Sequence, residues 1–220
     1  MDTDISPLDE ALRNATLNSI ENDTRKFIPK GEQERIITRD SVYAELERLK
    51  LADDENHLSK LADKIWEDEE PSTHGKTTSR KIFSILVLAD KVKEIGGLLF
   101  EGVNDDDLPF YFPSTTSKSK VFCKRREKEI SILQGWRSAD KDHFERYQWW
   151  MLSPHFQFSC ERLPKVKQYQ ALDQAVLPFI EEESNLEQPP WNEGGFSIVR
   201  RVMFHPSHYN SGDFYVRSLL

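Results

Sequence analysis

The feature that most limits the fold is one segment too apolar to lie on a protein surface. Between Lys76 and Lys93 the chain carries Ile82, Phe83, Ile85, Leu86, Val87, Leu88 and Ala89. A helix that is apolar nearly all round is buried on most sides rather than along one stripe. We therefore predict a helix over 76–93 at the centre of a helical bundle. Gly96-Gly97 is expected to end it, and residues 98–100 to pack back on it.

Further helices are predicted on both sides of this segment. Ser6-Pro7 is an N-cap followed by proline at the first helical position, Asp40 and Asp140 are candidate N-caps, and residues 58–66 follow the i, i+3, i+4, i+7 rule. The basic cluster 124–126 is expected to open another helix, and Trp149-Trp150 to pack at the edge of the core. The predicted fold class is mainly α, an irregular helical N-terminal domain followed by a short antiparallel β meander.

Changes in composition divide the chain into three parts. An acidic run before Pro71 and an acidic, proline-rich run over 181–190 are typical of linkers. The expected parts are 1–70, N-terminal helices and acidic linker; 71–185, a helical region with short strands; and 186–220, a segment of short strands.

Charge and targeting signals exclude several classes of protein. The 38 acidic and 30 basic side chains give a net charge of −8, against the basic footprint of a general nucleic-acid binder and against docking on an anionic membrane. The start of the chain lacks a signal peptide, and its longest apolar run is far below the roughly 20 residues of a bilayer span. We expect an intracellular protein, cytoplasmic or nuclear, that binds neither nucleic acid nor membrane.

Three patterns of chemical interest have simpler interpretations. Cys123 and Cys160 are too far apart to suggest a disulfide framework or a zinc site, and His205-x-x-His208 is interpreted as a surface turn. Gly75-Lys76-Thr77 lacks the earlier glycine of a phosphate loop, because position 70 is Glu70. We interpret it as a polar helix start, capped by a residue within 77–79. No metal site and no catalytic residue are predicted.

The C-terminal segment carries the one informative pattern. A nucleotide-covering glycine loop needs two strands, a tight turn with an aromatic tip, a valine over the base and a basic residue on a third strand. The run from 193 to 199 and the strand candidate over 214–220 supply these parts as Gly194, Gly195, Phe196, Val199 and Arg217.

These residues resemble the start of a protein-kinase catalytic domain. The kinase pattern G-x-G-G-F-G-x-V is met by Gly194, Gly195, Phe196 and Val199, and residues 214–217 resemble its third strand. Residues 201–208 and three upstream runs, 81–88, 101–110 and 176–181, resemble a group of filamentous-fungal protein kinases with a long helical N-terminal region. The resemblance implies the first strands of a kinase N-lobe over 186–220. It also implies nucleotide contacts from Gly194, Gly195, Phe196, Val199 and Arg217.

The departures from that pattern bear on activity. Asn192 and Ser197 stand where the pattern has glycines, and Arg217 replaces the third-strand lysine. No H-R-D or D-F-G follows Arg217 in the sequence, so ATP and Mg would bind only if the rest of a kinase domain were present. The first hypothesis is a truncated or degenerate kinase-like protein, inactive by itself, whose helical domain is an adaptor for an unknown protein partner. The alternative is the N-terminal fragment of an active Ser/Thr-type kinase. In either case the tail after Pro190 should be mobile or lean on the helical domain.

Overall fold

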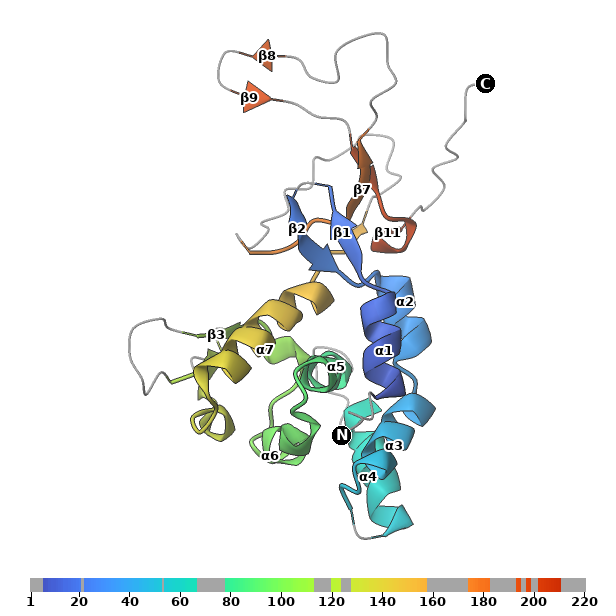
Figure 1. The fold of residues 1–220 in the computed structure, drawn as a ribbon, viewed down its shortest axis with the longest axis vertical. Helices are drawn as coiled ribbons and strands as arrows, with labels where there is room; N and C mark the ends of the chain where they lie inside the picture. The colour runs from blue at the N-terminus through green and yellow to red at the C-terminus, as the bar shows by residue number, and fades with distance from the viewer. Residues whose placement is uncertain are drawn as a thin grey trace, which may run out of the picture.

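The protein is mainly α. The computed structural model describes residues 6–20, 22–52, 54–66, 78–112, 120–123, 128–157, 174–182, 193–194, 197–198 and 202–210. In these ranges seven α-helices form a body, and short strands form small, mostly antiparallel sheets (Figure 1). The predicted fold class is therefore confirmed. None of the helices in the described part is long and apolar enough to cross a bilayer.

The predicted central helix is α5 (Arg80–Leu88), and every residue from Ile82 to Leu88 is buried. It lies between α1 (Pro7–Asn14) and α7 (Ser138–Met151), as Figure 1 shows, and also contacts α4 and α6. A single hydrophobic core forms around it, extending in sequence from Leu8 to Met151. Burial on all sides thus follows from the sequence pattern, as expected.

The end of α5 differs from the prediction. The helix stops at Leu88, where Asp90 takes a left-handed φ of 55°, and the chain continues through η1 (Val92–Glu94) into α6 (Ile95–Phe100). Gly96 and Gly97 lie inside α6 and do not end a helix. A Cβ on Gly97 would lie 2.7 Å from Cδ1 of Ile132, so a larger residue there would make the side chain of Ile132 shift.

Three helices form the other side of the body: α2 (Lys30–Ile36), α3 (Arg39–Arg48) and α4 (Glu55–Trp66). Thr38 rather than Asp40 caps α3, in a capping box with Ser41. Arg137 rather than Asp140 stands at the N-cap of α7. Both aspartates lie in the first turn of their helices, where a negative charge is favourable.

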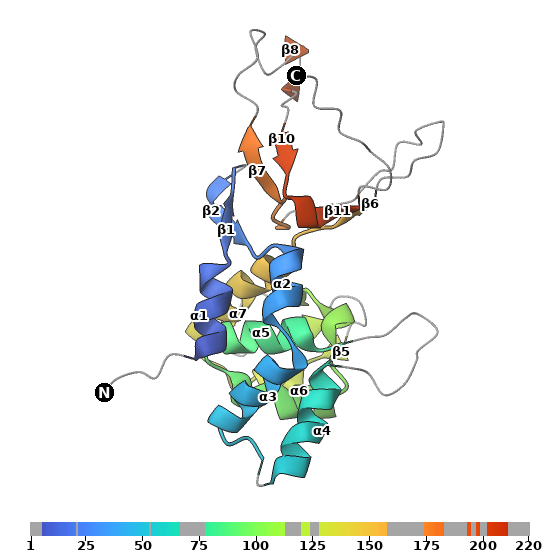
Figure 2. The same cartoon turned by 90° about the vertical axis from the view of Figure 1, so that its right-hand side faces the viewer.

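Most of the strands lie at the end of the body away from α3 and α4 (Figure 2). β1 (Leu17–Ser19) and β2 (Asn22–Phe27) form an antiparallel pair that the sequence analysis did not identify. β7 (Phe179–Glu182) pairs antiparallel with β10 (Val202–Phe204), and β6 (Phe156–Gln157) pairs parallel with β11 (Tyr209–Asn210), which follows η4 (Pro206–His208). The amide of Ile20 also donates to the carbonyl of Phe179 at 3.1 Å. Residues distant in sequence therefore meet here.

A three-stranded sheet lies against α7, joined to it through Phe110 and Gln148. It consists of β3 (Phe110–Tyr111), β4 (Phe122–Cys123) and β5 (Lys128–Glu129), and η3 (Ser131–Leu133) follows. The side-chain amide of Gln148 on α7 bonds both the amide and the carbonyl of Phe110, at 2.8 and 3.1 Å. Residues 124–126 lie outside the described part, but Lys128–Glu129 is a strand. The helix predicted to open at 124 therefore does not extend through Lys128–Glu129.

Phe83 in α5 and Phe100 at the end of α6 should differ sharply in their contribution to stability. Phe83 is fully buried in α5, whereas Phe100 is 94% exposed, so the expectation that all of 98–100 packs back on α5 is wrong for Phe100. We expect Phe83→Ala to lower the free energy of unfolding by about 3–5 kcal/mol, since it removes a buried ring. Phe100→Ala should stay within about 0.5 kcal/mol of the unmodified protein. Urea unfolding followed by circular dichroism measures both, and equal losses would contradict the central position of α5.

Candidate functional site

The residues assigned to a nucleotide by resemblance belong to a short C-terminal hairpin. β8 (Glu193–Gly194) pairs antiparallel with β9 (Ser197–Ile198), and Gly194 lies opposite Ser197. Gly195, Phe196, Val199 and Arg217 lie outside the described residues, as does the third strand predicted over 214–220. The described backbone at this place is one antiparallel pair of two-residue strands. Only Gly194 of the five residues lies within the described part, so the nucleotide contacts stay a prediction.

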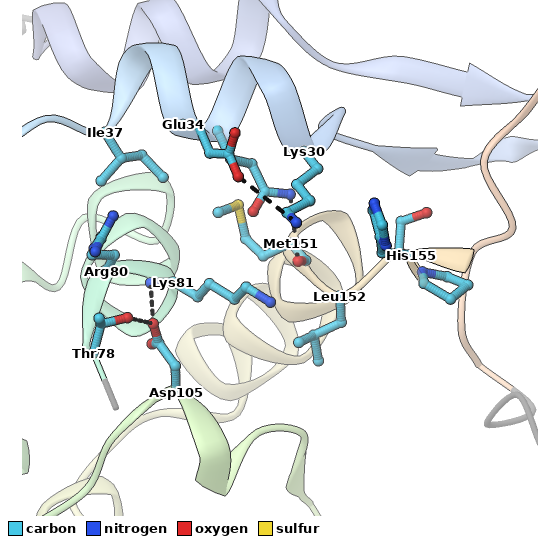
Figure 3. Close-up of a pocket in the computed structure, with 13 residues that line it drawn as sticks. Lys30, Glu34, Ile37, Thr78, Arg80, Lys81, Asp105, Met151, Leu152 and His155 are labelled. Carbon is cyan, nitrogen blue, oxygen red and sulfur yellow. Dashed lines mark hydrogen bonds and ion pairs between the residues drawn. The ribbon is translucent and has the colours of Figure 1, made fainter. Parts of the chain in front are cut away.

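A different region of the molecule forms a cavity. It has a volume of about 480 Å³ and lies where α2, the start of α5, η2 (Asp105–Asp107) and the end of α7 converge (Figure 3). Its walls combine apolar, cationic and acidic side chains: Lys30, Gln33, Glu34, Ile37, Thr78, Arg80, Lys81, Asp105, Met151, Leu152, Ser153, Pro154 and His155. A volume of this size suits a small-molecule ligand.

Asp105 forms one wall of this cavity and caps the central helix. Its Oδ2 accepts from the amide of Lys81 at 3.1 Å and from the hydroxyl of Thr78 at 2.8 Å, and its Oδ1 accepts from the amide of Ile82 at 3.0 Å. Ser79, at the N-cap position, makes no capping hydrogen bond. The predicted cap within 77–79 is therefore wrong for Thr78 and Ser79, because a carboxylate from η2 takes that role. Burial raises the pKa of Asp105, and the three donors oppose that rise.

Three cations line the cavity, and their partners differ. Lys30 lies 3.8 Å from Glu34 in an exposed pair, and Arg80 stacks at 3.7 Å on the ring of Trp66 while donating to its carbonyl. Lys81 extends across the cavity from the start of α5 toward Leu152 (Figure 3). Within the described residues its ammonium group forms no ion pair. Its charge is one of the effects that oppose the burial-induced rise in the pKa of Asp105.

His208 joins the C-terminal segment to the rim of the cavity. Its ring is 1% exposed; Nε2 accepts from the amide of Lys30 at 3.0 Å, so Nδ1 carries the proton and donates to the carbonyl of Pro154 at 2.9 Å. Burial lowers the pKa of His208 to about 4, and the nearby His205, His155 and Lys30 add to the effect. The interpretation of 205–208 as a surface turn is wrong for His208, which is a buried anchor with both ring nitrogens occupied.

The remaining sequence candidates have structural roles where they are described. Trp150 packs against the core and lies edge-on to Tyr147 at 4.8 Å, which confirms its predicted position. Cys123 is buried and donates to Asp107, whereas Cys160 lies outside the described residues. In the described part no three His, Cys, Asp or Glu side chains form a group suited to a metal ion.

No sequence pattern indicates the structural roles of Asp105 and His208, the two polar residues that fix helix starts beside the cavity. Asp105 stands in an Asn-Asp-Asp-Asp run that indicates only a turn, and His208 stands in a His-Pro-Ser-His turn. Each accepts a hydrogen bond from the first turn of a helix that starts elsewhere in the sequence. No local spacing of residues predicts such a contact. The helix-start amides that these two side chains accept from lie near them only in three dimensions.

Comparison with known proteins gave no assignment. The chain matches no family model, no curated protein and no solved structure. The cavity and the docked C-terminal strands are therefore the features from which a function is inferred.

Removing the carboxylate of Asp105 should destabilise the start of α5. We expect Asp105→Ala to lower the free energy of unfolding by about 2–3 kcal/mol, because two partly buried amides and one hydroxyl lose their acceptor. Asp142→Ala, at an exposed position on α7, is the matched control and should change stability by less than about 0.5 kcal/mol. Chemical denaturation of the two variants, with equal midpoints, would contradict the capping role.

Proposed function

We propose that this chain is a kinase-like protein that does not transfer phosphate by itself, and that its helical part is a binding module. The module holds the kinase-like C-terminal segment and presents a surface to a protein partner. ATP and Mg would be bound only together with the rest of a kinase domain. On the sequence signals above, the proposal places the protein in the cytoplasm or the nucleus, without a nucleic-acid or membrane partner.

The observation that carries the proposal is the docking of residues 202–210 on the helical body. β10 pairs with β7, β11 pairs with β6, and His208 bonds both the start of α2 and the segment after α7. The amide of His205 adds a bond to the carbonyl of Pro178 at 2.8 Å. The run that resembles the fungal kinases thus has its strand and its buried histidine fixed by the helical part. This supports a helical module whose task is to hold that segment.

The departures within the hairpin support the absence of catalysis. Ser197 pairs with Gly194 and stands at the position where the kinase pattern has its last glycine. A side chain there restricts the backbone where it must approach a phosphate. Arg217 replaces the lysine, and its planar guanidinium does not place a point charge as lysine does.

One observation favours the alternative, an N-terminal part of an active kinase. The pairing of Gly194 with Ser197 leaves Gly195 and Phe196 between the two strands in sequence, where the resemblance puts the loop tip. A tight hairpin at this place is the local geometry that a phosphate-covering loop needs.

A phosphoryl-transfer assay tests the main proposal. Incubated with Mg-ATP, the chain should produce no phosphorylated product above background, either on itself or on a generic acceptor protein, as followed by mass spectrometry. Turnover that disappears in Arg217→Ala but persists in Arg146→Ala, an exposed arginine on α7, would contradict it. Binding of Mg-ATP without turnover, weakened about tenfold by Arg217→Ala alone, would favour the alternative.

The docking itself makes a second prediction. His208→Ala should speed hydrogen exchange of the amides in 202–210 at least tenfold, since each lost buried hydrogen bond costs about 1–3 kcal/mol. Met203→Ala, an exposed change in the same segment, should not. Exchange measured by mass spectrometry on the full chain compares the two, and equal protection in both variants would remove the support for docking.

The same histidine predicts a pH dependence. Its folded pKa of about 4 lies below the usual 6.5, so the unfolded chain takes up the proton first as pH falls. Its contribution to stability is full above pH 6.5 and is lost between 6.5 and about 4. The pKa values of His155 and His205 are also lowered, mainly by burial, so they add to the loss in the same sense. Thermal melts at several pH values should therefore show a smaller acid-induced fall in His208→Ala than in the unmodified protein.

A further inference from the structure

The cavity between α2, α5 and α7 has the composition of a ligand site with one charged and one apolar side. Ile37, Met151 and Leu152 supply apolar surface, and Lys30 and Lys81 extend toward the same space from two different helices (Figure 3). Pockets for small organic molecules combine an apolar lining with a few convergent polar groups. The arrangement does not depend on the kinase-like character of the C-terminal segment.

One cation that lines the cavity, Lys81, has no ion pair with any described residue. The carboxylate of Asp105 is engaged by two amides and the hydroxyl of Thr78, and Arg80 is held on Trp66. Lys81 has no ion pair among the described residues, yet its ammonium group is directed into the cavity. Lys81 is partly buried, and an anionic partner would give its ammonium group a charge-assisted hydrogen bond.

Lys30 is available for the same anion at little cost. Its separation from Glu34 is 3.8 Å, and the side chains of the two residues are 49% and 65% exposed. An exposed pair of this kind contributes little to stability, so exchanging Glu34 for a bound anion loses little. The backbone amide of Lys30 is meanwhile fixed by His208, which keeps the base of the side chain in place.

At both helix starts beside the cavity, part of the first-turn amides already have side-chain acceptors. The first amides of α5 are occupied by Asp105, and the amide of Lys30 is occupied by His208. Lys30 and Lys81, whose side chains extend into the cavity, are the cationic groups that an anion there would meet. The pKa of the nearby His155 is lowered, chiefly by burial, so this ring adds no positive charge at neutral pH.

We propose that this cavity binds a small organic oxyanion, with Lys81 and Lys30 holding the anionic group and Ile37, Met151 and Leu152 packing against its apolar part. A volume of about 480 Å³ accommodates a ligand with one ring and one anionic group. A phosphate monoester and a carboxylate share this chemistry, and the test separates them.

Isothermal titration of the full chain with three probes tests the proposal. Phenyl phosphate and benzoate carry the ring with either anion, and inorganic phosphate lacks the ring. We expect saturable binding of at least one aromatic anion, tighter than that of inorganic phosphate because the apolar wall contributes. The tighter of the two aromatic probes identifies the source of the oxyanion. Saturable binding of none of them, or equal binding of neutral benzyl alcohol, overturns the proposal.

Variants locate the site. Lys81→Met keeps the apolar stem and removes the charge, so it should weaken binding at least tenfold, whereas Lys81→Arg should retain most of it. Lys60→Met, on the exposed face of α4, is the matched control and should bind as the unmodified protein does. Unchanged affinity in Lys81→Met overturns the proposal. Lys30→Met provides the same comparison at a more exposed position and applies if Lys81→Met fails to show a normal thermal melt.

Discussion

The structure depends on how two helix starts are satisfied without local caps. α5 is buried on nearly all sides, and Ser79 does not cap the amides of its first turn. The carboxylate of Asp105 supplies that acceptor. At α2, Pro29 offers no side-chain cap, and the ring of His208 accepts from the first amide instead. Each of these bonds fixes a turn distant in sequence against a helix, and the cavity lies between them.

The hydrogen bonds of Asp105 and His208 also bear on the charge of the cavity, which lysines and an arginine line although the chain as a whole is acidic. Asp105 and His208 are placed by the need to cap helices, so Asp105 is already committed and His208 stays neutral at ordinary pH. The net charge of −8 therefore says little about this region, because the lysines there face a carboxylate that is largely engaged. Local charge, rather than the total, governs which ligand class the cavity suits.

The sequence predicted what periodicity encodes and missed what distant contacts impose. Burial of 82–88 follows from a pattern that leaves no polar face, and Ser6-Pro7 starts α1 as expected. The pair β1–β2 was missed because its residues over 22–26 are polar and lack alternation. The Gly96-Gly97 pair predicts a helix end, whereas Gly97 lies inside α6 with Ile132 packed against it. The cavity escaped prediction because its walls come from four elements, and the capping residues sit in ordinary turn sequences.

Lys30 connects the two proposals physically. Its backbone amide is the donor that holds His208, and its side chain lines the cavity, so the docked segment and a bound anion both act on the first turn of α2. An anion that orders Lys30 favours the state in which that turn is formed, which is also the state that receives His208. Linkage makes the effect reciprocal: docking of 202–210 must then favour anion binding by the same factor. Docking of 202–210 and occupancy of the cavity would thus be coupled through Lys30.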